Sequence, residues 1–181
     1  MASSSQLAGL GANLSWASGT LNWTNPTNIY ADDTSYATAS SSSDYITHYL
    51  RASNFGFAIP SGATILGFQA IVRVKASSLD PGNTYVTFWS LKPVDASGAL
   101  GAEKLGMGSS WPVTESDMTF GSATDLWGMT LTPDVVNDTD FGVAISAKGV
   151  KGTGEKPPTA YIDCVTIVVY YSTFIPKCIF V

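Results

Sequence analysis

His48 is the only histidine in the chain, so any Ser–His–Asp or Cys–His catalytic centre would have to use it. It lies in residues 45–50, an alternating strand pattern with no nucleophile motif beside it. We therefore expect His48 to be a partly buried strand residue. The two cysteines, Cys164 and Cys178, match no zinc or redox spacing and are expected to be free thiols. No catalytic residue, metal ligand or cofactor-binding residue is predicted, and the protein is expected not to be an enzyme.

The acidic residues are the next candidates for chemistry. A glycosidase needs two carboxylates that face each other across the scissile bond. A β protein with 14 acidic residues can present such a pair by chance, so the sequence assigns none. Asp134, Asp138 and Asp140 crowd one segment and could bind calcium through oxygen ligands. EF-hand spacing is missing, and turn formation explains these residues equally well. The glycine-rich residues 149–156 lack the ending of a phosphate loop.

Exposed tryptophans could serve a binding function, because their rings stack on sugars or anchor protein interfaces. Trp16, Trp23 and Trp111 stand beside Ser, Asn, Thr or Pro and are the predicted exposed members of the five. We name them as interface candidates. Packing in the core or at a sheet edge is the alternative for each of them.

Alternation of apolar and polar residues, typical of half-buried strands, is the dominant pattern of the chain. It is clearest at residues 66–75, 84–94 and 141–148, while residues 160–172 are apolar on both faces. Weaker strands are expected at 44–51, 54–59, 111–119 and 126–131, with a hairpin where residues 55–59 lead into the strand that begins near Thr64. No helical pattern is evident. These elements predict an all-β fold: a two-layer antiparallel β-sandwich, jelly-roll-like, of about eight strands.

The ends of the chain differ in composition from the middle. Residues 1–12 are rich in Ser, Ala and Gly and are expected to form a flexible N-terminal arm that orders only on assembly. Residues 13–173 are assigned to the sandwich, and residues 174–181 form an apolar C-terminal tail. The tail folds back over its own domain or docks on a neighbouring subunit. Its interface candidates are Phe174, Ile175, Ile179, Phe180 and Val181.

Charge excludes several partners. The net charge is −5, the sequence has no run of Lys or Arg, and charged residues make up only 13% of the chain. Nucleic-acid binding and attachment to an anionic membrane both need a basic surface, so neither partner is expected. Residues 1–5 have neither the basic nor the apolar region of a secretory signal. An extracellular role would then require another exit, such as cell lysis.

Several strings together resemble a β-sandwich domain of structural proteins in tailed bacteriophages and prophages. They are Trp-Thr-Asn-Pro at 23–26, Asp-Asp-Thr-Ser-Tyr-Ala-Thr-Ala at 32–39, the stretch from Tyr49 to Ile65, Leu-Trp-Gly at 126–128, Asp-Phe-Gly-Val at 140–143 and Val-Thr-Ile-Val-Val-Tyr-Tyr at 165–171. The resemblance covers roughly residues 20–172. Its motifs are turn glycines, prolines and aromatics, which specify a fold more than an activity.

The resemblance implies a virion component that is assembled in the host cytoplasm. The leading interpretation is a non-enzymatic capsid decoration (cement) protein that binds and stabilises the shell, with the major capsid protein or other virion proteins as partners. A homo-oligomer, such as a trimer, is expected. A tail or fibre component and a carbohydrate- or receptor-binding module are the alternatives, so a glycan stays open as a ligand. A glycan-cleaving enzyme is the least favoured reading.

Overall fold

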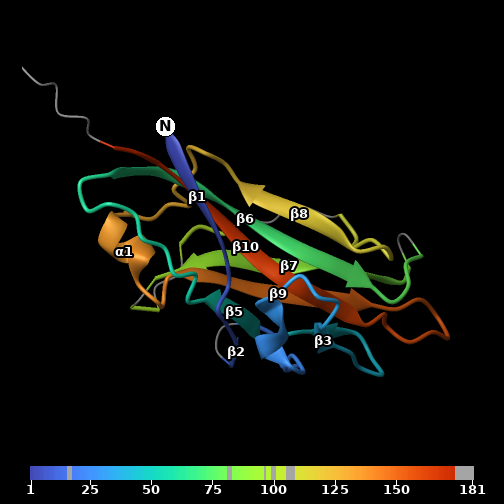
Figure 1. The fold of residues 1–181 in the computed structure, drawn as a ribbon. Coiled ribbons are helices and arrows are strands. Elements are labelled where there is room, and N and C mark those ends of the chain that lie inside the picture. The colour runs from blue at the N-terminus through green and yellow to red at the C-terminus, as the bar shows by residue number, and fades with distance from the viewer. Residues whose placement is uncertain (16–17, 81–82, 96, 99–100, 105–108, 174–181) are drawn as a thin grey trace, which may run out of the picture.

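The structure is a computed structural model, and it describes residues 1–15, 18–80, 83–95, 97–98, 101–104 and 109–173. Two antiparallel sheets pack face to face, which confirms the predicted β-sandwich (Figure 1). Sheet A runs β1 (Ala2–Leu7), β10 (Ala160–Ser172), β6 (Thr64–Ala76) and β8 (Ser116–Gly121), with β3 (Ala37–Ala39) also on β10. Sheet B runs β2 (Leu10–Leu14), β5 (Tyr49–Ser53), β9 (Gly142–Val150) and β4 (Tyr45–Ile46), with β7 (Tyr85–Val94) also on β9.

Two short helices interrupt the strands: the 3-10 helix η1 (Pro26–Ile29) and the α-helix α1 (Pro133–Asn137). The sequence predicted only a turn at α1. Thr132 caps this helix because its side chain accepts a hydrogen bond from the Val135 amide, and Pro133 occupies the first turn. No helix in the described part of the chain is long and apolar enough to cross a membrane.

Aromatic side chains join the two sheets at the centre of the sandwich. Phe68 of β6 stacks on Trp127 with ring centroids 4.8 Å apart and meets Phe141, immediately before β9, edge-on at 5.5 Å. Phe88 of β7 meets Phe120 of β8 at 4.9 Å. Such pairs add to the burial of apolar area, so these contacts fix the two sheets against each other.

The core positions that the alternation predicted are confirmed in sheets A and B, with one exception. Phe68, Val72, Val74, Phe141, Val143, Ile145 and Ile162 are fully or almost fully buried. The prediction that Val168 faces the core is wrong, because this residue is half-buried on the outer face of sheet A. The register of β10 against β6 shifts between Ile162 and Val165, where β10 carries an extra residue. This bulge reverses the alternation, so that Val165, Ile167 and Val169 face the core instead.

The N-terminal segment is also corrected. Residues 1–12 are not a flexible arm: β1 pairs with β10 from Ala2 to Leu7, and β2 pairs with β5. The sequence suggested disorder because the segment has little apolar surface. Edge strands need little, since backbone hydrogen bonds to a formed neighbour hold them. The described strands number ten rather than about eight. Three of them, β1, β2 and β3, were not predicted, residues 44–51 divide into β4 and β5, and two of the predicted strands do not form.

Two weaker strands are wrong for a backbone reason. Residues 54–59 form no strand and no hairpin, because Asn54 and Gly56 have positive φ and break the ladder. Phe55, Phe57 and Ile59 nevertheless alternate into the core as expected. Instead of pairing, this segment carries the chain from sheet B to sheet A, and the Asn137 side chain bonds both backbone groups of Ile59.

Residues 126–131 likewise form turns rather than a strand. Trp127 and Gly128 both have positive φ, which lies outside the extended conformation that a regular strand needs. The Trp127 indole still reaches the core, where its Nε1–H donates to the Phe68 carbonyl at 2.9 Å.

Candidate functional site

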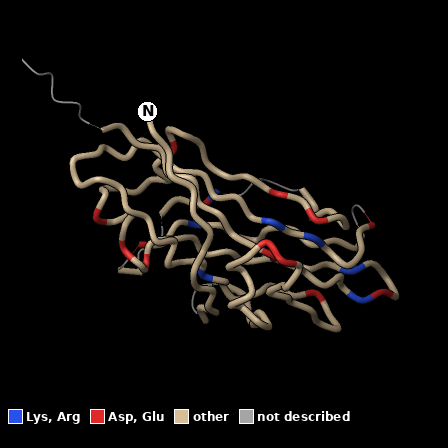
Figure 2. Tube along the Cα trace, viewed as in Figure 1, with Lys and Arg blue, Asp and Glu red and all other residues tan. Residues whose placement is uncertain are grey.

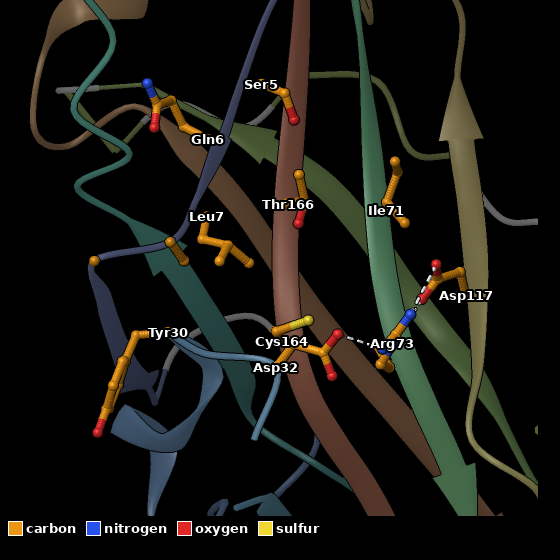
Figure 3. A pocket seen from close by; sticks show the side chains of 12 residues that line it. Ser5, Gln6, Leu7, Tyr30, Asp32, Ile71, Arg73, Asp117, Cys164 and Thr166 are labelled. Carbon is orange, nitrogen blue, oxygen red and sulfur yellow. Dashed lines mark hydrogen bonds and ion pairs between the residues drawn. The ribbon is translucent and has the colours of Figure 1, made fainter. Parts of the chain in front are cut away.

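A hollow of about 690 Å³ opens on the outer face of sheet A (Figure 3). Its floor comes from β10 and β6, and its walls come from β1, β8 and the segment that follows η1. In each strand every second side chain points outward, so side chains from residues far apart in sequence meet on this face. We define this surface as the outer-face hollow.

An ion-paired triad lies at one end of the outer-face hollow. Arg73 donates from its Nη1 to Asp32 Oδ2 at 2.5 Å and from its Nε to Asp117 Oδ1 at 2.8 Å. These hydrogen bonds raise the pKa of Arg73, and the bond to Asp117 has a larger effect than the bond to Asp32. Because both carboxylates are about half exposed, the pairs contribute little to folding stability. Their effect is to leave this end of the hollow with paired charges.

The other end of the outer-face hollow is lined by uncharged side chains, some polar and some apolar. Ser5 and Leu7 of β1 lie beside Thr166 of β10 and Ile71 of β6 (Figure 3). Leu7 is 41% exposed, and Tyr30 at the rim is 55% exposed. Exposed apolar side chains gathered around a hollow are typical of an interaction surface.

Below the triad lies a carboxyl group that solvent cannot reach. The β10 bulge places both Asp163 and Cys164 opposite Arg73, and both are buried. Burial raises the pKa of Asp163 to about 6, and repulsion from Glu115 and the close carboxyl of Asp32 act in the same direction. Burial likewise raises the pKa of the Cys164 thiol to about 12. Cys164 is a free thiol, as expected; Cys178 lies outside the described residues.

Next to the triad, a lysine is held by tyrosines. Lys75 Nζ donates to the Tyr36 hydroxyl at 2.7 Å and lies 3.9 Å from the centroid of the Tyr36 ring. This hydrogen bond raises the pKa of Lys75. Tyr161 packs edge-on against Tyr36, so the segment before β3 is fixed over β6 and β10.

The tryptophan predictions need correction. Trp23 and Trp111 are 2% and 0% exposed, so neither is an interface residue. The polar neighbours of Trp23 do not expose it, because Asn13 bonds its backbone and its indole Nε1–H donates to the His48 carbonyl. Trp111 packs on Phe88 instead. Trp16 and the five tail candidates lie outside the described residues, so their placement stays a prediction.

Trp89, which was not among the interface candidates, is 44% exposed. The adjacent aromatics Phe88 and Trp89 indicate from sequence that one of the two lies outside the core, since neighbours in a strand point to opposite faces. Phe88 is the buried member. The register of β7 shifts at this point, so Trp89 sits on a bulge, where Lys148 Nζ lies 5.3 Å from the centroid of its ring.

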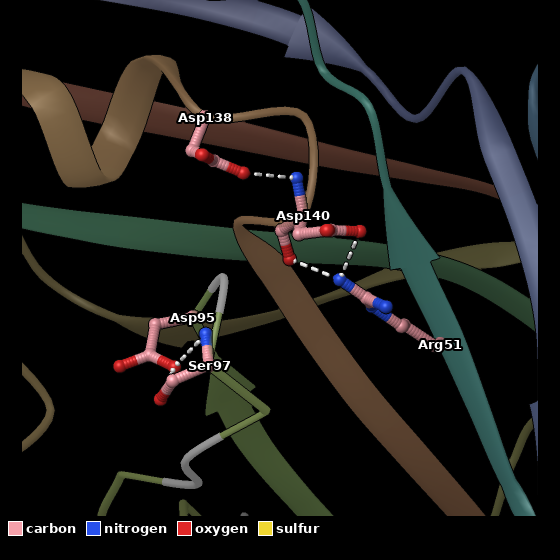
Figure 4. A network of polar contacts seen from close by, with 5 residues as sticks. All are labelled: Arg51, Asp95, Ser97, Asp138 and Asp140. Atoms are coloured by element: carbon pink, nitrogen blue, oxygen red, sulfur yellow. Dashed lines mark hydrogen bonds and ion pairs between the residues drawn. The ribbon is translucent and has the colours of Figure 1, made fainter.

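The acidic segment considered for calcium is used in turns and ion pairing (Figure 4). Asp138 Oδ1 accepts the Asp140 amide, and Asp140 binds the Arg51 guanidinium from β5 at 2.7 Å. Asp134 and Asp138 line a smaller hollow of about 310 Å³ with Asp95 and Ser97. Across the described ranges, no three His, Cys, Asp or Glu side chains form a ready metal-binding group.

Charged residues are sparse along the trace, and Lys and Arg are few (Figure 2).

His48 follows the expected structural role: it is partly buried between β4 and β5, and its Nδ1 lies 3.1 Å from the Ser18 carbonyl oxygen.

Comparison with known proteins assigns no family. No family model matches the chain, and no curated protein matches it. Among solved structures, the chain is similar to PfGH50B, with a TM-score of 0.36 and 10% identity over 92% of this chain and 22% of that one. It is also similar to an exo-beta-agarase, with a TM-score of 0.34 and 11% identity over 95% of this chain and 23% of that one. The chain therefore spans less than a quarter of either protein.

Proposed function

We propose that the chain is a non-enzymatic virion structural protein of the capsid decoration type, which docks on the shell through the outer-face hollow of sheet A. The observation that carries this proposal is the uncovered face itself: a broad hollow with exposed Leu7 and Tyr30 beside self-paired charges. A partner that covers this face buries apolar surface and leaves no unpaired charged side chain among the described residues that line the hollow, because Arg73 is already paired with Asp32 and Asp117. Decoration stabilises a shell by mass action, because the ligand binds only the assembled state.

The carboxyl groups support a binding role over hydrolysis. A glycosidase pair needs one acid with a raised pKa and one ionised partner, both in contact with substrate. Asp32 and Asp117, which line the hollow, are both bound to Arg73. Asp163 has the raised pKa but is fully buried. A carbohydrate-binding module remains the second candidate, favoured by the exposed rings of Tyr30 and Trp89.

The direct test is the composition of the particle. We expect this chain to occur at a fixed stoichiometry in purified particles of the phage or prophage that encodes it, measured by quantitative mass spectrometry. Density for a β-sandwich on the shell surface is expected by electron microscopy. Particles that lack the chain, or a chain found only at the tail, would contradict capsid decoration.

The surface is tested by Ile71→Arg. Ile71 points into the outer-face hollow, and a docked partner would bury the new unpaired charge. We expect affinity for undecorated particles to fall by at least about 100-fold, measured by co-sedimentation, with an unchanged thermal midpoint. The control is Tyr85→Arg on β7 of sheet B, which is also half-buried and is expected to keep full binding. Equal binding by both variants would place the contact elsewhere.

The C-terminal tail is tested by truncation. We propose that residues 174–181 cross a subunit boundary in a homo-oligomer, such as a trimer. Removing them should leave the circular dichroism spectrum of the sandwich unchanged and weaken self-association or particle binding by at least about tenfold, since six of the eight residues are apolar. Light scattering after size-exclusion chromatography measures this. A truncated chain that assembles like the full chain would make the tail a cover for its own domain.

A further inference from the structure

Asp163 is a buried carboxyl group that belongs to none of the ion pairs among the described residues. Its side chain is fully buried, and neither carboxylate oxygen has a hydrogen-bond partner of good geometry. A buried ionised carboxylate is strongly unfavourable, so such a group is paired, binds a metal or takes up a proton. Arg73 lies opposite the bulge, yet its guanidinium is bound to Asp32 and Asp117.

The neighbours of Asp163 increase the negative charge. The Asp32 carboxyl lies close to it from the segment after η1, and repulsion from Glu115, in the chain entering β8, also raises the pKa of Asp163, whereas the Asp33 backbone lowers it. Glu115 also has a buried oxygen, Oε1, without a partner. Lys75 is bound to the Tyr36 hydroxyl rather than to either carboxylate. None of the ion pairs found among the described residues includes Asp163 or Glu115.

We propose that Asp163 and Asp32 hold a calcium ion between β10 and the segment that follows η1. Two carboxylates would be supplemented by backbone oxygens and water, because the described side chains offer no third carboxylate, His or Cys in ligand position. Oxygen-only ligands select a hard cation. Calcium accepts such irregular shells, whereas magnesium demands near-octahedral geometry. The ion ties the crossing segment to the last strand of sheet A, next to the outer-face hollow.

The first experiment is a calcium titration of the full chain. After treatment with EDTA and dialysis at pH 7.5, CaCl₂ at about 5 mM should raise the thermal midpoint by about 3–6 °C, as expected for a site of submillimolar affinity. MgCl₂ should give less than half of that rise. Terbium luminescence, excited through the aromatic residues, should report direct binding that calcium displaces.

Matched variants assign the ligands. Asp163→Asn should abolish the calcium response and terbium binding, and Asp140→Asn, which breaks an ion pair on sheet B, should keep both. Should Asp163→Asn not fold, Asp32→Asn changes the more exposed ligand and should weaken calcium binding by at least about tenfold. An unchanged midpoint of the unmodified chain in calcium overturns the proposal, as does an equal response by Asp163→Asn. A calcium-insensitive chain that Asp163→Asn stabilises would show that Asp163 is neutralised by a proton instead.

Discussion

Phe68→Ala is expected to lower the free energy of unfolding by about 3–5 kcal/mol, as truncation of buried aromatics does generally. Phe68 is fully buried, and its ring contacts both Trp127 and Phe141. Alanine leaves a cavity between the sheets and removes both ring contacts at once. For a domain of this size the loss corresponds to a fall of about 6–20 °C in the thermal midpoint. Urea unfolding followed by tryptophan fluorescence measures the free energy of unfolding, and a thermal melt followed by circular dichroism measures the midpoint.

The matched control is Trp89→Ala, which removes a larger aromatic side chain from a strand. Trp89 is 44% exposed and contacts the Lys148 ammonium rather than the core. We expect it to cost no more than about 1 kcal/mol. If the two variants lose equal stability, the aromatic contacts around Phe68 do not join the sheets as described.

The fold class could be predicted from the sequence because alternation is a direct consequence of half-burial. Phe68, Val72 and Val74 face the core as expected, and the same holds for Val143 and Ile145 in sheet B. The pattern failed where the backbone changes its phase. In β10 the bulge after Ile162 reverses which residues face the core, and a strand that is apolar on both faces carries no sign of it. Sequence offers no local signal for such a bulge.

The candidate site could not be predicted, for a different reason. Asp32, Arg73 and Asp117 come from three segments that meet only through the sheet A register. The prediction of exposed tryptophans failed for a similar reason, because polar neighbours in the sequence do not determine whether a side chain is buried. Trp23 is covered by contacts with Asn13 and His48, neither of which is adjacent to it. Which strands pair with each other must be known before the triad or the exposed aromatic residues can be predicted.

Deletion of residues 1–14 is expected to destabilise the whole sandwich, which a flexible arm would not do. The deletion removes an edge strand from each sheet: β1, which pairs six residues with β10, and β2, which pairs five residues with β5. Between them the chain crosses from sheet A to sheet B, where the Ala8 amide donates to Val165 and the Gly9 amide to Ser53. The segment therefore links the two layers at one edge.

The expected loss is at least about 5 kcal/mol, since each backbone hydrogen bond contributes about 0.5–1.5 kcal/mol net and buried surface is exposed as well. The thermal midpoint should fall by about 10–20 °C. Gly11 gives a point-mutation version of this test, because a Cβ there would lie 1.9 Å from the Pro26 carbonyl oxygen of η1. Gly11→Ala should lower the midpoint by forcing β2 away from η1, and Ala12→Gly, at the next position in β2, serves as its control. A chain without residues 1–14 that melts within about 3 °C of the full chain would show that these strands add little, because a domain of this size shifts by about 2–4 °C per kcal/mol.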